Sequence, residues 1–233
     1  MKKRYSKDML ETYDVIRLAI PFYDTFQSKV AEFIKNFFGK ASPIRIIDLG
    51  CGTGLTSIGV LEQMPYAEIT LVDYDPIVIE QAKKRLKNYE KRTLFILEDG
   101  LKYLKKLPDN SCEAVISALM LHNLKSTLRL KYLEEIYRIL IKGGVFVNAD
   151  KYASDDEEKH KRDLEFHLNC FEVFKRKISE EVAENWRKHF MEDMEQDKIM
   201  FSKRSVVQLK KIGFSSVKEY YRNHMFAVLV AEK

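Results

Sequence analysis

Three glycines recur at alternate positions directly after a short apolar run, and this spacing is the clearest chemical signal in the chain. Gly50, Gly52 and Gly54 follow Asp48, and the next ten residues read as a helix. Glycine adopts positive φ without strain and lets a ligand approach the main chain. A strand, a glycine turn and a helix N-terminus together form a cradle for a nucleotide-type cofactor.

Two further acids come at the ends of later apolar runs. Asp73 lies 19 residues after Gly54, where a doubly wound fold places a carboxylate for ribose hydroxyls. A carboxylate suits that task because its two oxygens only accept hydrogen bonds. Asp75 precedes Pro76 and is predicted to cap the following helix. Asp99 also precedes a short helix, so it is a candidate helix cap.

The glycine pattern separates two classes of cofactor. In the dinucleotide fingerprint G-x-G-x-x-G the third glycine would fall on Leu55, which disfavours an NAD oxidoreductase. The motif D-L-G-C-G-T-G instead resembles the first motif of the class I S-adenosylmethionine (SAM) methyltransferases, (D/E)-x-G-x-G-x-G. That resemblance implies SAM as cofactor and S-adenosylhomocysteine as product. It places Tyr74 beside the adenine and Asp99 on the adenine amino group, and its full set of cofactor-binding residues here is Tyr23, Asp48, Gly50, Cys51, Gly52, Gly54, Asp73, Tyr74, Asp99, Gly100 and Ser117.

Two of the candidate residues, His122 and Tyr23, can also be interpreted as structural residues without a functional role. His122 follows the segment beginning at Ser117, which resembles the family's S-A-L-x-x-H-H-L stretch near the transferred methyl. It is the candidate catalytic residue, as a base or a substrate contact, although a lone histidine is more often structural. Tyr23 follows a corner at Pro21 and resembles a tyrosine that contacts SAM in the carboxy-SAM synthases. A core aromatic is the alternative.

The apolar periodicity predicts the elements that position these residues. Strands are expected over 44–49, 67–73, 94–97, 114–119 and 145–150, with helices between them and a terminal hairpin over 216–221 and 226–231. The helix over 126–140 is expected to end at a K-G-G turn, residues 142–144. This alternation predicts an α/β fold: a doubly wound, Rossmann-like, seven-stranded sheet of the class I methyltransferase type.

The chain is expected to form one methyltransferase domain over residues 1–233, with four parts. Residues 8–38 form an N-terminal helical cap, 40–150 the SAM-binding core, 151–203 a helical insertion, and 204–233 a terminal helix and strand hairpin. The insertion starts at the carboxyl end of the fifth strand, the ligand side of such sheets. We therefore expect the cap and the insertion, with aromatics such as Phe171 and Trp186, to roof the acceptor site.

Composition limits the remaining possibilities. Net charge is +5, from 40 basic and 35 acidic residues, so RNA stays open as a partner without being favoured. No apolar run is long enough for a membrane span, and no membrane partner is expected. Three cysteines without C-x-x-C spacing indicate reduced thiols and a cytoplasmic protein. His160, His167 and Cys170 lack a fourth ligand, so no metal site is expected. Monomer and homodimer are both compatible with the sequence.

The sequence therefore predicts a SAM-dependent methyltransferase that acts on a small molecule by in-line methyl transfer. Two alternatives remain: a carboxy-SAM synthase-like or tRNA-modifying enzyme, and a SAM-binding module without catalysis. Carboxy-SAM synthases hold the added carboxylate with an arginine of the penultimate helix. The matching position here is Gln208, which lacks that charge, although Arg204 is close.

Overall fold

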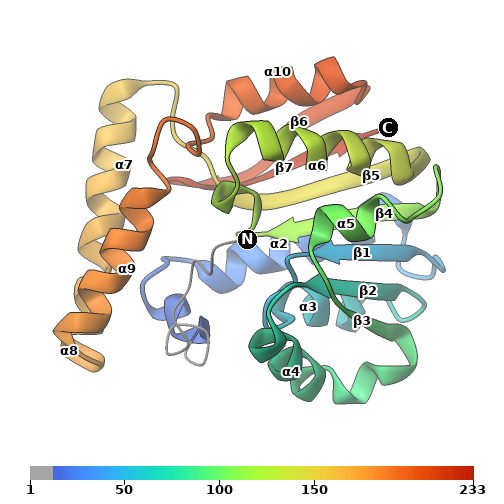
Figure 1. Cartoon of the computed structure of the whole chain (residues 1–233), viewed down its shortest axis with the longest axis horizontal. Helices are drawn as coiled ribbons and strands as arrows, with labels where there is room; N and C mark the ends of the chain where they lie inside the picture. The colour runs from blue at the N-terminus through green and yellow to red at the C-terminus, as the bar shows by residue number, and fades with distance from the viewer. Residues whose placement is uncertain (1–12) are drawn as a thin grey trace.

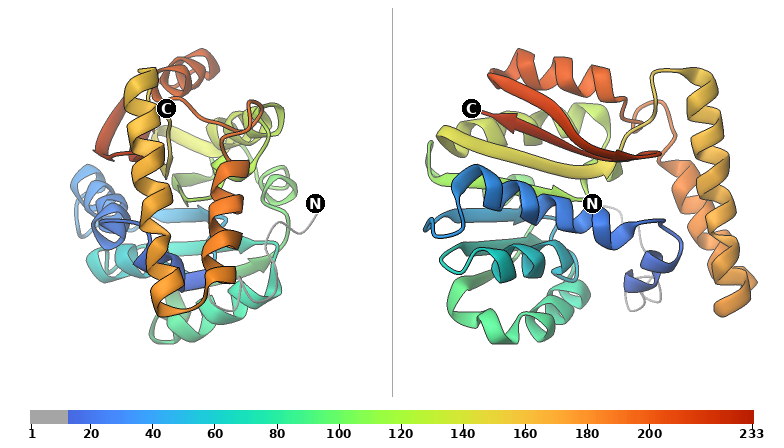
Figure 2. Two further views of the ribbon diagram at one scale, coloured as in Figure 1. Left: turned by 90° about the vertical axis from the view of Figure 1, so that its left-hand side faces the viewer. Right: turned by 180° about the vertical axis from the view of Figure 1, so that it is seen from behind.

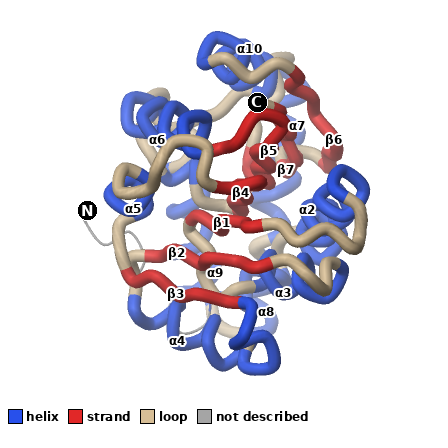
Figure 3. Tube along the Cα trace, turned by 90° about the vertical axis from the view of Figure 1, so that its right-hand side faces the viewer, coloured by secondary structure: helices blue, strands red, loops and turns tan. Residues whose placement is uncertain are grey.

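A seven-stranded sheet in the order β3-β2-β1-β4-β5-β7-β6 forms the centre of the molecule (Figures 1 and 3). The computed structural model describes residues 13–233. All strands run parallel except β7, which is antiparallel to both of its neighbours. The strands are β1 (Arg45–Leu49), β2 (Glu68–Asp73), β3 (Thr93–Leu97), β4 (Cys112–Ala118), β5 (Leu140–Lys151), β6 (Ser216–Asn223) and β7 (Phe226–Glu232). The predicted α/β fold with a seven-stranded sheet is confirmed.

Helices cover both faces of this sheet, because each strand buries alternate side chains on opposite sides. In β1, Ile46 packs into one core cluster with α2, α3 and α4, and Ile47 packs into the other with α5, α6 and α10. The helical elements are η1 (Tyr13–Leu18), α2 (Tyr23–Phe38), α3 (Leu55–Gln63), α4 (Pro76–Arg85), η2 (Lys87–Arg92), α5 (Gly100–Leu104), η3 (Leu121–Asn123), α6 (Ser126–Ile139) and α10 (Ser202–Ile212), where η marks a 3₁₀ helix.

The prediction that α6 ends at a K-G-G turn is wrong. The helix already ends at Ile139, and β5 begins at Leu140, so both glycines lie inside the strand. Four residues of β5 there oppose one residue of β4, which makes a bulge between the pairs Cys112–Leu140 and Ala114–Val145. A Cβ at Gly144 would lie 2.9 Å from the Glu113 carbonyl oxygen, so glycine allows the two strands to pass closely.

The N-terminal segment turns a corner before α2, as predicted. In its described part the first helix is the 3₁₀ helix η1, and residues 8–12 of the predicted cap lie outside the described residues. Phe22, which precedes α2, has φ 59° and is 61% exposed. Helix α2 then crosses the back of the sheet, with Phe26 and Ile34 fully buried (Figure 2, right).

Three helices stand together beyond the end of β5: α7 (Glu157–Cys170), α8 (Glu172–Lys177) and α9 (Glu180–Glu192). They stand across the carboxyl end of the parallel strands, and the opposite end of the strands has no such cover (Figure 2). Their aromatic side chains join the same apolar cluster as η1, α2 and β7. A single β-bridge between Ala153 and Phe201 closes the base of this segment, which the sequence predicted as a helical insertion.

Candidate functional site

The glycine turn lies where β1 ends and α3 begins. Gly50, Gly52 and Gly54 have φ values of 66°, 52° and 80°, so each uses the left-handed region that favours glycine. At Gly50 the restriction is also steric, because an added Cβ would lie 2.3 Å from Cγ of Met120. The turn therefore brings bare main chain to the end of the sheet, as the motif predicted.

Asp48 and Ser117 support the turn from within the protein. The Ser57 hydroxyl donates to Asp48 Oδ2 at 2.6 Å, and burial raises the pKa of Asp48 to about 7. The Ser117 hydroxyl donates to the Leu49 carbonyl at 3.0 Å and is fully buried. Both predicted cofactor residues thus lie beneath the turn and make their hydrogen bonds inside the fold.

Asp73, at the end of β2, holds the turn from the other side. Its Oδ2 accepts from the Gly52 amide at 3.0 Å, and its Oδ1 accepts from the Asp75 amide at 3.0 Å. Burial raises the pKa of this carboxyl above its usual range. Each carboxylate oxygen has a further lone pair, so Asp73 can still accept from ribose hydroxyls. Asp75 caps α4 through the Ile77 amide at 2.8 Å, as predicted.

The predicted adenine-side residues lie at the start of α5 and after β2. Asp99 accepts from the Lys102 amide at 3.0 Å and so caps α5, one of the two roles expected for it. A Cβ at Gly100 would lie 3.0 Å from the ring of Tyr132, which is buried on α6. Tyr74 is 40% exposed. The contact of Tyr74, Asp99 and Gly100 with a ligand stays a prediction.

A small cavity of about 30 Å³ lies directly against the glycine turn, and we call it the turn cavity. Tyr23 and Gln27 of α2 form one wall, and Ala118 and Leu119 at the end of β4 form another. Its lining residues are Tyr23, Gln27, Gly50, Cys51, Gly52, Thr53, Leu55, Thr56, Ala118 and Leu119. Tyr23 is buried, at 5% exposure, and also belongs to this lining, while its contact with SAM stays a prediction.

The N-terminal segment is tied to the turn by polar contacts. Asp14 Oδ1 accepts from the Thr53 hydroxyl at 2.7 Å, and Asp14 Oδ2 pairs with Arg85 of α4. Arg85 also donates to the Thr53 carbonyl, and the Thr56 hydroxyl donates to Gln27 at 2.5 Å. These contacts close η1 and α2 over the turn cavity.

A second cavity, also of about 30 Å³, lies between the N-terminal segment and the helices α7–α9, and we call it the inner cavity. Its lining residues are Ile16, Ile20, Leu119, His122, Lys151, Phe171, Trp186, His189, Phe190 and Phe226. The N-terminal segment and the insertion, including Phe171 and Trp186, thus line one cavity, and its use as the acceptor site stays a prediction. Leu119 belongs to both cavities, so the two adjoin at the end of β4.

Leu119 itself has an uncommon backbone conformation, with φ 53°. A left-handed conformation in a branched, non-glycine residue costs about 1–3 kcal/mol and tends to mark functional sites. Its amide donates to the Ala149 carbonyl at 2.9 Å, and its carbonyl accepts from Asn123 Nδ2 at 3.1 Å. The neighbouring strand and the loop therefore hold Leu119 at the junction of the cavities.

The polar wall of the inner cavity is a buried group of charged side chains. His122 Nδ1 lies 2.5 Å from Asp150 Oδ1, and the His122 amide donates to Asp150 Oδ2 at 3.2 Å. Burial acts to raise the pKa of Asp150, but His122 and Lys151 hold it below its usual range. Lys151 bonds to Asp193 and lies over the Phe190 ring, 4.6 Å from its centroid. In the sequence His122 stands apart from other candidate catalytic residues, but in the structure it belongs to this network of charged side chains.

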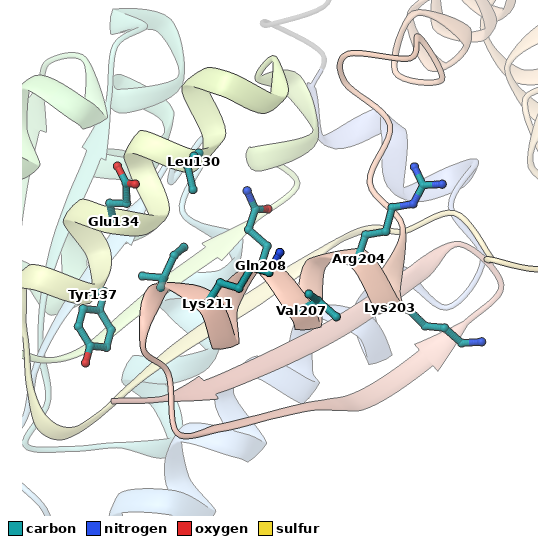
Figure 4. Close-up of a pocket in the computed structure, with 9 residues that line it drawn as sticks. Leu130, Glu134, Tyr137, Lys203, Arg204, Val207, Gln208 and Lys211 are labelled. Carbon is teal, nitrogen blue, oxygen red and sulfur yellow. The ribbon is translucent and has the colours of Figure 1, made fainter.

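The other sequence candidates lie elsewhere. His167 is buried against Phe226, and burial lowers its pKa to about 3, which suits a neutral core histidine. Arg204 and Gln208 line an open groove between α6 and α10 together with Tyr137 and Lys211 (Figure 4). That groove shares no lining residue with either cavity. Arg204 stacks on Phe201, so it does not replace an arginine facing the cofactor.

Comparison with known proteins agrees with this fold. Residues 46–144 match the family described as a methyltransferase domain, which spans the glycine turn, Asp73 and Asp99. The strand order and the glycine turn are those of the class I methyltransferase fold, and residues 46–144 form a SAM-dependent methyltransferase domain.

Individual relatives refine this placement. Carboxy-S-adenosyl-L-methionine synthase from Nautilia profundicola is 22% identical over 94% of this chain and 89% of its own length. The fold is shared with a candidate SAM-dependent methyltransferase from Methanococcus maripaludis, at TM-score 0.66, 21% identity and coverage of 100% and 95% of the two chains. It is also shared with human N-acetylserotonin methyltransferase in complex with SAM, at TM-score 0.64, 19% identity and coverage of 98% and 56%.

Sequence reasoning did not predict Asp150, Lys151, His189 or Asp193 as site residues. Asp150 and Lys151 end a strand whose periodicity only indicated burial. His189 and Asp193 are four residues apart, so they lie one turn apart at the end of α9, and that spacing was the available signal. Within residues 13–233 no helix has both the length and the apolar character needed to cross a membrane. All three cysteines are free.

Proposed function

We propose that this enzyme transfers the methyl group of SAM to a small molecule bound in the inner cavity. The observation that carries the proposal is the inner cavity itself. It adjoins the turn cavity at Leu119 and is walled by aromatic side chains from the insertion and apolar side chains from the N-terminal segment. A site walled in this way suits a compact acceptor better than a polynucleotide.

The cofactor in this proposal lies on the glycine turn. Its ribose faces Asp73, its adenine lies by Tyr74, Asp99 and Gly100, and its methionine part lies in the turn cavity beside Tyr23 and Cys51. The sulfonium methyl then points past Leu119 toward the inner cavity. We place the enzyme in the cytoplasm, in keeping with its free thiols.

The reaction is an in-line displacement, so the protein chiefly orients donor and acceptor. A lone pair of the acceptor attacks the methyl carbon, and the carbon–sulfur bond breaks with its electron pair on sulfur. An acceptor hydroxyl also loses its proton, which goes to a nearby base or to water. His122 faces the acceptor in this arrangement, and its contact with Asp150 at 2.5 Å orients its ring.

One alternative rests on a specific observation, the similarity to carboxy-SAM synthases over 94% of the chain. In that case SAM itself would be modified, by gain of a carboxylate on its methyl group. The position of Gln208 in the α6–α10 groove, apart from both cavities, weighs against this alternative.

Mass spectrometry of the small molecules released from the purified, denatured protein distinguishes these functions. We expect SAM or S-adenosylhomocysteine, and a carboxylated SAM would overturn the proposal. In a second assay, SAM labelled in its methyl group is incubated with a low-molecular-weight cell extract or with total tRNA. Label should enter small molecules, and label found only in tRNA would contradict a small acceptor.

A further inference from the structure

Three buried side chains converge at the polar wall of the inner cavity. One potential ligand atom from each of His122, His189 and Asp193 lies within 4.8 Å of the other two. The three residues are 4%, 7% and 1% exposed. Two imidazoles and one carboxylate are a donor set that binds divalent transition metals, as in catalytic zinc sites.

The fold holds these side chains on two packed elements. His189 and Asp193 lie one turn apart at the end of α9, and His122 belongs to η3, directly after β4. The Trp186 ring packs edge-on against His189, with ring centroids 5.7 Å apart. The site is therefore formed where the insertion meets the end of the sheet.

Asp150 gives His122 the orientation of a metal ligand. Its carboxylate oxygen lies 2.5 Å from Nδ1, so the other ring nitrogen, Nε2, is turned toward Asp193, whose Oδ2 is 3.6 Å away. Metal-binding histidines typically donate their other ring nitrogen to a carboxylate in this way. This contact is a second feature, independent of the cluster itself, that points to an ion.

Distance and charge are both compatible with an ion. At metal–ligand bonds of about 2.0–2.2 Å, two ligand atoms of a tetrahedral site lie about 3.3–3.6 Å apart, so side-chain movements of up to about 1.5 Å bring the three atoms to bonding positions. Lys151 bonds to Oδ2, one of the two oxygens of the Asp193 carboxylate. With His122 neutral, as a metal ligand must be, the carboxylates of Asp150 and Asp193 face one ammonium group, that of Lys151.

We propose that His122, His189 and Asp193 bind one divalent transition metal ion, of which Zn²⁺ is the type, with a further coordination position open to the inner cavity. The ion would lie next to Leu119 and therefore close to the transferred methyl. There it would bind the acceptor oxygen and lower the pKa of an acceptor hydroxyl. This inference rests on the proposed function. The metal site indicates that the acceptor is a molecule with an acidic or chelating hydroxyl, such as a phenol, an enol or a hydroxy acid.

The test uses metal binding itself, without turnover. The full chain is treated with a chelator, dialysed, and titrated with Co²⁺, whose visible absorption reports coordination, and with Zn²⁺ in a calorimeter. We expect one ion per chain. His189→Gln should weaken binding at least tenfold, in line with the cost of disturbing a metal site. His160→Gln, a histidine of α7 outside the cluster, is the matched control and should bind like the wild type.

Each outcome decides the proposal. Stoichiometric binding that is lost in His189→Gln and kept in His160→Gln supports it, provided circular dichroism shows both variants folded. If His189→Gln does not fold, Asp193→Asn takes its place. Absence of Co²⁺ binding, or equal binding by wild type and the cluster variants, overturns it and leaves Lys151 as the cation of the site. Full methyl transfer by metal-free protein would also overturn it, while the proposed function would stand.

Discussion

At the scale of single residues, the buried Asp48 beneath the glycine turn makes the stability of the protein depend on pH. It is 1% exposed, and burial raises its pKa to about 7, whereas an unfolded chain has an aspartate pKa near 3.9. Between these values the folded protein holds a proton that the unfolded chain has released. This carboxyl therefore stabilises the fold at low pH, and its contribution falls as pH rises from about 4 to about 7.

We predict that Asp48→Asn removes this part of the pH dependence. The free energy of unfolding of the wild type should fall with pH relative to the variant, by at most about 1.4 kcal/mol per pH unit. Urea unfolding at several values between pH 5 and pH 8 measures it. The difference between the two proteins is the readout, because groups such as His167 titrate in both. Parallel curves would show that Asp48 is ionised throughout.

Asp73 is the residue whose removal should affect the cofactor most. Asp73→Ala deletes a charged acceptor for the ribose and releases the Gly52 amide, which the carboxylate holds at 3.0 Å. Hydrogen bonds to charged groups contribute about 1.5–3 kcal/mol, so SAM should bind roughly ten- to hundredfold more weakly. Calorimetry with SAM tests this, and Asp75→Ala, which removes only a helix cap, is the control. An unchanged affinity in folded Asp73→Ala would restrict Asp73 to a structural role.

At the scale of elements, the N-terminal segment and the α7–α9 helices must move for ligands to enter. The two cavities hold about 30 Å³ each, whereas sites for drug-sized ligands measure about 300–1,000 Å³. Trp186 lies in the inner cavity and is the only tryptophan, so its fluorescence reports on this movement. We predict that S-adenosylhomocysteine changes Trp186 emission and slows hydrogen exchange in residues 157–192. Confirmed binding without either change would make the insertion a rigid wall.

The contacts of Asp14 are predicted to retain the cofactor. Arg85→Gln breaks the Asp14–Arg85 pair, which is partly exposed and so contributes about 0.2–1 kcal/mol. S-adenosylhomocysteine should then dissociate about two- to fivefold faster in stopped-flow fluorescence. Arg17→Gln is the control, because it breaks a pair with Asp24 within the same N-terminal segment. Equal dissociation rates in both variants would show that the Asp14–Arg85 pair does not retain the cofactor.

At the scale of the whole molecule, the insertion shares its apolar core with the sheet. Phe171, Phe174 and Trp186 belong to the same buried cluster as Phe26 of α2 and Phe226 of β7. Cooperative unfolding follows when packing is continuous in this way. We predict that Trp186 fluorescence and far-ultraviolet circular dichroism report one coincident urea transition. Separate midpoints would mean that α7–α9 fold as an independent unit.

Local patterns predicted the sheet better than they predicted the site. The β-branched run before Gly50 and the glycine spacing determine strand, turn and helix within a few residues of chain, so their positions were correct. The K-G-G segment was misread because a bulge in β5 depends on Glu113 of the neighbouring strand. The network of His122, Asp150, Lys151 and Asp193 joins three elements, and no local pattern records that contact. Ser117 likewise bonds to Leu49, a partner 68 residues away.

Leu119 connects the two cavities, and this has a consequence for the order of events in turnover. The same strained residue forms the wall of the turn cavity and of the inner cavity. A cofactor bound on the glycine turn would contact Leu119 and so complete the wall of the inner cavity. The acceptor then meets its finished binding site only after SAM has entered, and S-adenosylhomocysteine leaves last. The enzyme would therefore follow an ordered kinetic mechanism in which SAM binds first, and the protein without SAM would not bind its acceptor.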